Sequence, residues 1–170
     1  MNSKKNLVFL GMMGSGKSSI GFLVSKKLNL KFFDIDSIIE NEVGIKISNI
    51  FKEKGENFFR DMEEKITIKI LKNNNGVISL GGGGFINKKI RAEVLTNNFS
   101  IWLSWDIKTL LTRIKNSKKR PLVSNSTNQE NKNLIKERLK IYSKAKFKID
   151  CNNLTKTEIV DKVIKIYELN

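Results

Sequence analysis

The chain has 170 residues, of which 39% are hydrophobic and 29% charged, a globular balance that fits one domain over residues 1–170. Its net charge of +15 would attract anionic substrates, but lysines are spread along the chain and no stretch interleaves them with aromatic residues, so we expect no nucleic-acid partner. The sequence contains no histidine, which excludes Ser-His-Asp triads and the usual zinc sites and leaves carboxylates or lysines as catalytic bases.

Residues 6–10 form the first predicted strand, and a glycine-rich loop follows it directly. Gly11–Ser19 matches the phosphate-binding pattern G-x-x-x-x-G-K-[ST], and an apolar helical pattern covers residues 20–28. In this strand–loop–helix context the glycines let backbone N–H groups surround an anion, and the start of the helix adds its positive dipole end. A glycine turn that only links strand to helix would not explain Lys17, which should reach the β- and γ-phosphates, or Ser18, which should bind Mg²⁺.

The apolar run before this loop is too short for a signal peptide, and no apolar segment approaches the length of a membrane span. The single cysteine, Cys151, excludes an internal disulfide and is typical of a reducing compartment. We therefore expect a cytoplasmic protein with no membrane partner, in which Cys151 is a small buried residue at a strand end.

The second predicted strand, residues 31–35, ends at Asp34-Ile35-Asp36. Alternation along a strand would place both carboxylates on one side, where they could position Mg²⁺ and accept a hydroxyl proton, with Ile35 in the core. Taken alone, this pattern more often marks a helix cap. Short helical stretches without a strand are expected over residues 36–61.

A helix is predicted where apolar residues recur from Phe59 to Ile70. Arg60 lies three residues before Glu63 and four before Glu64, so these side chains share one face of that helix. Arg60 and one of these glutamates form either a surface ion pair or a contact that holds Arg60 in position to bind a substrate carboxylate.

Three more strands are predicted at residues 76–80, 100–103 and 147–151, with helical patterns at residues 107–114, 134–142 and 159–167. The third strand runs into Gly81–Gly84, and four glycines after a buried strand indicate close approach of the backbone to another group. Residues 116–128 are polar and basic, and indicate either a mobile lid or a solvated surface loop. Alternating strands and helices predict a three-layer α/β domain with a parallel sheet between helices.

In its combination of motifs the chain resembles the shikimate kinases over nearly its whole length. The motifs are the glycine loop, D-x-D, G-E-x-x-F-R-x-x-E, G-G-G, R-P-L and R-x-x-x-Y, found here at Gly11–Ser18, Asp34–Asp36, Gly55–Glu63, Gly81–Gly83, Arg120–Leu122 and Arg138–Tyr142. The resemblance implies a P-loop kinase fold with a five-stranded parallel sheet, a substrate-binding segment at 34–61 and a mobile lid at 113–128. It also implies transfer of the γ-phosphoryl group of ATP to the 3-hydroxyl of shikimate, by a protein that we expect to be a monomer.

The resemblance also assigns roles to single residues. ATP would contact Gly14, Ser15, Gly16, Lys17, Ser18, Ser19, Arg113 and Arg120, with Arg113 packing against adenine and Arg120 closing over the phosphates. Shikimate would contact Asp36, Arg60, Gly82 and Arg138, the two arginines gripping its carboxylate. Ser18 and Asp34 would hold Mg²⁺, Asp34 through water, since the strand before the glycines lacks an aspartate. Lys17, Asp36 and Arg120 would be catalytic, with Asp36 acting either as a general base or only as an orienting group.

Three other functions remain open at this point. Gluconate kinases rely on a histidine-containing motif, which this chain lacks. Nucleotide kinases need a pocket for a base where this chain has Asp36, Arg60 and the glycine run. A non-enzymatic P-loop domain that switches or binds nucleic acid has only the positive net charge in its favour.

Overall fold

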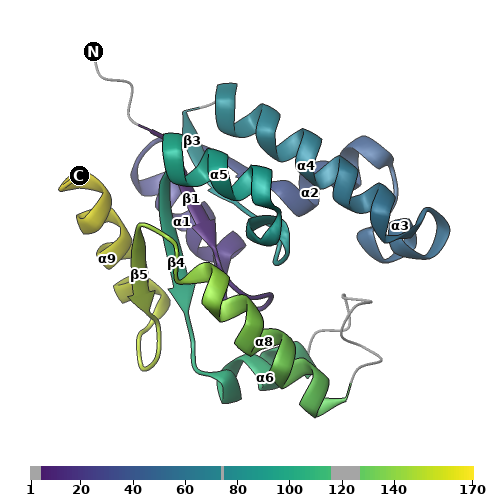
Figure 1. The fold of residues 1–170 in the computed structure, drawn as a ribbon. Helices are drawn as coiled ribbons and strands as arrows, with labels where there is room; N and C mark the ends of the chain where they lie inside the picture. The colour runs from purple at the N-terminus through teal and green to yellow at the C-terminus, as the bar shows by residue number, and fades with distance from the viewer. Residues whose placement is uncertain (1–4, 74, 116–126) are drawn as a thin grey trace.

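The computed structural model describes residues 5–73, 75–115 and 127–170. Within these ranges a five-stranded parallel sheet lies between helices (Figure 1), which confirms the predicted α/β fold class. The elements in chain order are β1 (Leu7–Leu10), α1 (Lys17–Lys27), β2 (Lys31–Asp34), α2 (Ile35–Val43), α3 (Ile47–Glu53), α4 (Gly55–Asn73), β3 (Gly76–Ser79), the 3₁₀ helix η1 (Gly84–Ile86), α5 (Lys88–Asn97), β4 (Phe99–Ser104), α6 (Ile107–Lys115), α8 (Asn128–Tyr142), β5 (Phe147–Asp150) and α9 (Lys156–Glu168).

The strand order across the sheet is β2-β3-β1-β4-β5, so the strand that leads into the P-loop lies at the centre. Val8 of β1 is in register with Ile78 of β3 on one side and with Ser100 of β4 on the other. Because all strands run parallel, the segments that follow β1, β2 and β3 emerge at the same edge. Ligands bind at this carboxyl edge in open α/β sheets.

Side chains of β1 alternate between the two faces of the sheet, as the period of a strand requires. Leu7 and Phe9 pack in a cluster with apolar residues of α1 and α9, whereas Val8 and Leu10 pack in a second cluster with residues of α4, α5 and α8. All four side chains are fully buried. The continuous apolar run thus reflects a strand that is covered on both faces.

The predicted helices are present, and residues 36–61 contain α2, α3 and the start of α4 without a strand, as expected. Helices α2 and α3 pack against α4 beyond the β2 edge of the sheet (Figure 1). Helix α5 was not predicted, because only Ile90 and Val94 of its residues are buried and the apolar pattern is correspondingly short.

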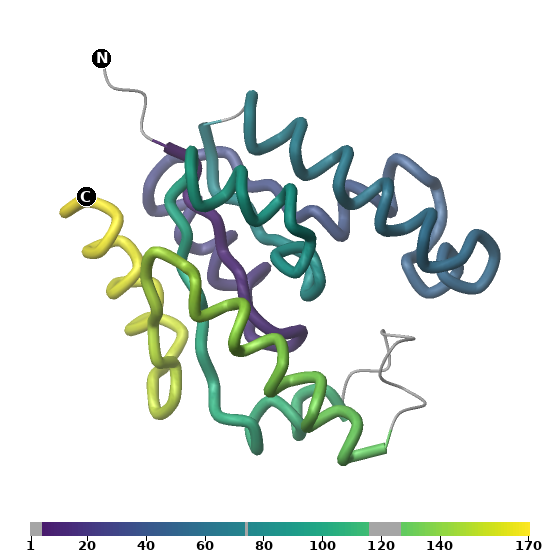
Figure 2. The backbone as a smooth tube through the Cα atoms, in the orientation of Figure 1, coloured from purple at the N-terminus to yellow at the C-terminus, as the bar shows by residue number. Residues whose placement is uncertain are grey.

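The two ends of the described chain lie close together, as the backbone tube in Figure 2 shows. The hydroxyl of Tyr167 in α9 donates a hydrogen bond of 2.9 Å to the carbonyl of Lys5, just before β1. In the part of the chain that the structure describes, no helix combines the length and apolar character needed to cross a membrane.

Candidate active site

The P-loop connects β1 to α1 through backbone conformations that favour glycine. Gly11, Gly14 and Gly16 have φ values of 142°, 76° and 91°, which residues with a Cβ rarely adopt. Helix α1 begins at Lys17, and Gly16 at its N-cap offers no side-chain cap. A helix N-terminus at the end of such a loop is a favourable place for a phosphate group.

The side chain of Lys17 folds back over its own loop and is 6% exposed. Its Nζ donates hydrogen bonds of 3.0 Å to the carbonyls of Gly11 and Met12. The hydroxyl of Ser19 donates to the carbonyl of Gly16 at 3.1 Å. Ser15 is buried, its backbone N–H donates to the carbonyl of Met12 at 3.1 Å, and its hydroxyl has no hydrogen-bond partner among the described residues.

The strand alternation predicted for Asp34 and Asp36 is wrong, because β2 ends at Asp34 and Asp36 lies in the first turn of α2. Asp34 is the helix cap, and its Oδ1 accepts a hydrogen bond of 3.0 Å from the N–H of Ser37. Ile35 is fully buried, as expected. Both carboxylates nevertheless reach the same cavity, since the chain turns there from strand to helix.

This cavity has a volume of about 350 Å³ and lies at the carboxyl edge of the sheet. Its lining residues are Met13, Ser18, Asp34, Asp36, Ser37, Glu40, Ile47, Phe51, Phe59, Arg60, Glu63, Gly82, Gly83 and Arg138. The size fits a small molecule. Predicted residues for the metal, the acceptor hydroxyl and the acceptor carboxylate thus come together in one place, although they span more than 100 positions of the chain.

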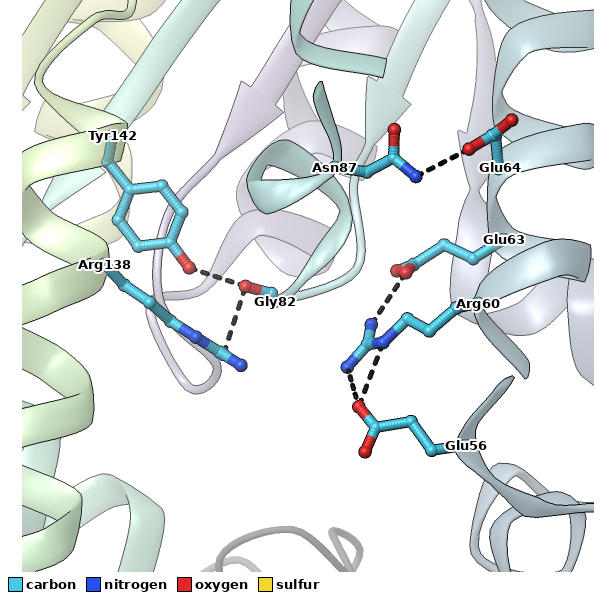
Figure 3. A network of polar contacts seen from close by, with 8 residues as sticks. All are labelled: Glu56, Arg60, Glu63, Glu64, Gly82, Asn87, Arg138 and Tyr142. Carbon is cyan, nitrogen blue, oxygen red and sulfur yellow. Dashed lines mark hydrogen bonds and ion pairs between the residues drawn. The ribbon is translucent and has the colours of Figure 1, made fainter. Parts of the chain in front are cut away.

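Arg60 is held from two sides by carboxylates of its own helix (Figure 3). Its Nη1 donates to Glu63 Oε2 at 2.7 Å, and its Nε and Nη2 donate to Glu56 Oε1 at 3.2 and 3.1 Å. The Glu63 side chain is only 2% exposed, whereas that of Glu56 is 50% exposed. Of the two predicted alternatives, the geometry favours an arginine that is held in place, because its main partner is a buried carboxylate rather than a surface charge.

Burial raises the pKa of the Glu63 carboxyl above its usual value, an effect that the Arg60 guanidinium opposes and the nearby Asp36 carboxylate strengthens. Glu63 Oε1 is buried without a hydrogen-bond partner among the described residues. A Cβ added to Gly81 would lie 2.6 Å from this oxygen and 2.6 Å from Asp36 Oδ1. The first glycine of the run therefore leaves room for two carboxylates that approach the same point.

The second glycine of the run connects to α8. The carbonyl of Gly82 accepts hydrogen bonds from the Tyr142 hydroxyl at 2.5 Å and from Arg138 Nη1 at 3.3 Å. In Figure 3, Arg138 and Arg60 lie on opposite sides of Gly82, one carried by α8 and the other by α4. Two cations from different helices thus line one cavity, an arrangement suited to a single small anion.

Arg113 lies outside this cavity, against the P-loop. Its Nη1 donates to the carbonyl of Gly14 at 3.2 Å, and its guanidinium carbon is 3.7 Å from the ring centroid of Trp105. Arg113 lies in the last turn of α6 and Asn128 opens α8, so the described part contains only the ends of the predicted lid, 113–128. Arg120 and the other lid residues at 116–126 lie outside the described residues.

Three contributions of the site were not assigned from the sequence. Tyr142 was noted only as part of a motif, Glu63 was one of two candidate partners of Arg60, and Trp105 was given no role. Trp105 directly follows β4, and its position at the carboxyl edge of a buried strand is the signal that could have identified it. Glu64, the other candidate partner of Arg60, instead accepts hydrogen bonds from Asn87 and Lys89.

The described residues contain no group of three or more acidic or cysteine side chains placed to hold a metal ion. Mg²⁺ at kinase sites needs no such cage, because it keeps several waters and is bound by one or two protein oxygens together with substrate phosphates. Ser18 Oγ lies 3.5 Å from Ser79 Oγ at the end of β3, and Asp34 lines the same cavity. These oxygen donors fit a magnesium ion that arrives with a nucleotide.

A family model, sequence relatives and solved structures of 27% and 34% identity all point to one family. The family model described as shikimate kinase matches residues 13–168. A shikimate kinase of a Sulfurihydrogenibium species is 38% identical over 160 residues, covering 94% of this chain and 96% of the relative. Among solved structures, shikimate kinase from Aquifex aeolicus is 34% identical with a TM-score of 0.86, covering 96% of each chain. Shikimate kinase from Acinetobacter baumannii, solved in complex with shikimate, is 27% identical with a TM-score of 0.90, covering 98% of this chain and 94% of that one.

Proposed function

The chain belongs to the shikimate kinase family, and we propose that shikimate and the terminal phosphate of ATP meet in the cavity lined by Asp36, Arg60 and Arg138. The chain is a kinase that transfers the γ-phosphoryl group of ATP to the 3-hydroxyl of shikimate. The single observation that carries the assignment of the site is that Arg60 and Arg138, from different helices, line the same cavity as Asp36 beside the P-loop.

The shikimate carboxylate binds between Arg60 and Arg138 in this proposal. Each guanidinium can offer two parallel N–H donors to a carboxylate, which fixes both position and orientation. Arg60 is oriented before the substrate arrives by its bonds to Glu63 and Glu56. Arg138 donates to the Gly82 carbonyl at 3.3 Å, a long contact that leaves its other N–H groups available to the substrate.

The attacking hydroxyl donates its proton toward Asp36, which aligns the oxygen with the γ-phosphorus. The new oxygen–phosphorus bond forms while the bond to the ADP oxygen breaks, and the hydroxyl proton passes to Asp36. Because phosphoryl transfer passes through a loose transition state, alignment and charge neutralisation supply most of the catalysis. Asp36 therefore acts mainly by orienting the nucleophile and takes the proton late.

The P-loop supplies positive charge to the transferred group. Backbone N–H groups over Gly14–Ser19 and the N-terminus of α1 surround the β- and γ-phosphates. Lys17 exchanges its bonds to the carbonyls of Gly11 and Met12 for bonds to these phosphates. Arg120, outside the described residues, closes over them, and Arg113 packs against the adenine.

Ser18 and Asp34 would hold Mg²⁺, Ser18 directly and Asp34 through water. When bound there, the ion would supply positive charge that neutralises the phosphates. Asp34 keeps its second carboxylate oxygen for this purpose, since Oδ1 already accepts from Ser37. The hydroxyl of Ser79 lies beside that of Ser18, where it can bind a water of the ion.

We further propose that residues 1–170 act as one kinase domain and as a monomer in the cytoplasm, with ATP and shikimate as substrates. The thiol of Cys151 is fully buried after β5 and needs no oxidising compartment. Light scattering on the purified protein with and without shikimate tests the monomeric state.

An acceptor screen tests the proposed function. ADP release is followed by a coupled assay with ATP, Mg²⁺ and either shikimate, gluconate or CMP as acceptor. We expect release only with shikimate. CMP has no carboxylate for the two arginines, and gluconate is an open chain, whereas the ring of shikimate holds its carboxylate and its 3-hydroxyl at a fixed separation that matches Arg60, Arg138 and Asp36. Release with gluconate or CMP at a comparable rate would refute the assignment of the acceptor site.

A further inference from the structure

Trp105 connects three parts of the nucleotide side of the molecule. It follows the last residue of β4, and its indole Nε1 donates a hydrogen bond of 2.9 Å to the carbonyl of Ser15 in the P-loop. Its ring carries the Arg113 guanidinium of α6 on one face at 3.7 Å. Arg113 in turn donates to the carbonyl of Gly14, so the indole, the guanidinium and the loop backbone form a closed set of contacts.

The approach of α6 to the P-loop is close. A Cβ added to Gly14 would lie 3.3 Å from the Cβ of Arg113, and the φ of +76° at Gly14 already disfavours any other residue. Arg113 therefore lies directly on the loop, with its guanidinium carbon over the indole ring at 3.7 Å. A planar cation stacked on an aromatic face keeps its orientation, and its opposite face stays available for a second ring.

We infer that Trp105 is a positioning residue of the nucleotide site, which holds the P-loop through its N–H and presents Arg113 as a flat surface on which adenine stacks. This inference rests on the proposed contact between Arg113 and adenine. A guanidinium that is already stacked loses less conformational freedom when the base binds than one that moves freely in water. Trp105 thus contributes to nucleotide affinity through Arg113 and through the loop, without contacting the acceptor.

The two contacts of Trp105 can be separated by substitution. Trp105→Phe removes the hydrogen bond to Ser15 and keeps a ring beneath Arg113, whereas Trp105→Leu removes both. Calorimetric titrations with ADP and with pyrophosphate distinguish the effects, because pyrophosphate uses the P-loop but has no base. Shikimate is titrated into each variant as the control for the fold of the acceptor site.

We expect Trp105→Phe to weaken ADP and pyrophosphate alike, by about threefold, as fits the loss of one hydrogen bond. Trp105→Leu should weaken ADP binding by a further factor of roughly 3 to 10, whereas its affinity for pyrophosphate should equal that of Trp105→Phe. Shikimate affinity should be unchanged in both. Equal affinities of Trp105→Phe and Trp105→Leu for ADP would overturn the inference. So would a Trp105→Leu variant whose affinities for ADP, pyrophosphate and shikimate all fall by the same factor.

Arg113→Ala separates this inference from the proposed function. If Arg113→Ala leaves ADP affinity unchanged, the proposed adenine contact itself is wrong, and the role of Trp105 falls with it. If Arg113→Ala weakens ADP but Trp105→Leu does not, only the role of Trp105 is wrong. If Trp105 and Arg113 act through one stack, the double variant should bind ADP only about threefold more weakly than Arg113→Ala. That remaining factor is the loss of the hydrogen bond to Ser15.

Discussion

Removing the Arg60 guanidinium should have separate effects on stability and on acceptor binding. In Arg60→Ala the buried Glu63 carboxylate, 2% exposed, loses the partner that stands 2.7 Å away. Breaking a buried ion pair by deleting one partner costs about 3–5 kcal/mol, because the remaining charge is uncompensated. The contact with Glu56 adds less than about 1 kcal/mol, since that side chain is half exposed.

The stability loss should depend on pH in a definite direction. The pKa of Glu63 is already raised above its usual value near 4.5 by burial, and the loss of the Arg60 charge that opposes this shift raises it further. A carboxyl group whose pKa is raised in the folded state favours folding below the unfolded value and disfavours it as the pH rises through the folded value. Arg60→Ala should therefore approach wild-type stability toward pH 4.5 and fall behind as the pH approaches neutrality.

Urea unfolding of wild type and variant at several pH values from 4.5 to 7.5 measures this difference. Arg60→Ala/Glu63→Gln serves as the matched control, since it removes the stranded charge and should recover most of the lost stability at pH 7.5. A difference in unfolding free energy that is below about 1 kcal/mol at pH 7.5, or that does not change with pH, would refute the buried ion pair.

Acceptor binding should not recover in the double variant. Loss of one partner of a buried charged contact weakens binding by about 2–5 kcal/mol, so the KM for shikimate should rise roughly 30- to 4,000-fold in both variants. The KM for ATP should stay close to that of wild type, since Arg60 belongs to the acceptor side. A rise in the KM for ATP alone, with the KM for shikimate unchanged, would show that the acceptor site is assigned wrongly.

Three further predictions concern the P-loop, the glycine run and the thiol. Lys17→Ala should lower kcat in the coupled ADP-release assay by roughly 10²–10³, through loss of a cation at the transferred phosphate, with circular dichroism unchanged; unaltered turnover would contradict its role. Gly81→Ala should raise the KM for shikimate roughly 10- to 100-fold, because the new Cβ displaces the Asp36 or Glu63 carboxylate. Gly84→Ala is its control, since there the nearest atom lies at an ordinary 3.5 Å, and equal effects of the two would refute the reasoning. Burial raises the pKa of the Cys151 thiol to about 12, so a disulfide reagent at pH 8 should label one thiol in denaturant and none in the folded protein; rapid labelling of the folded protein would contradict its burial.

Local chemistry made several parts of this molecule predictable. The apolar run Leu7–Leu10 marks β1 directly, and each of the five strands lies within a residue or two of its predicted ends. The P-loop was predictable because phosphate binding requires glycines and a lysine at a fixed spacing in the sequence. Helix α5 was missed because two buried apolar residues are too few to define a helical period. Asp36 was misplaced because capping by Asp34 ends the strand one residue earlier than the alternation implied.

The order of the strands in the sheet and the contacts between distant side chains could be established only from the three-dimensional structure. The sequence by itself determined which segments are strands, where the phosphate loop lies and which residues belong to the family motifs, because these depend on neighbours a few positions away. Only the tertiary structure decided that Arg60 and Arg138 line one cavity, that Glu63 rather than Glu64 holds Arg60, and that Trp105 supports Arg113. Burial and distance between remote residues arise from packing of the layers, and packing is a property of the whole chain.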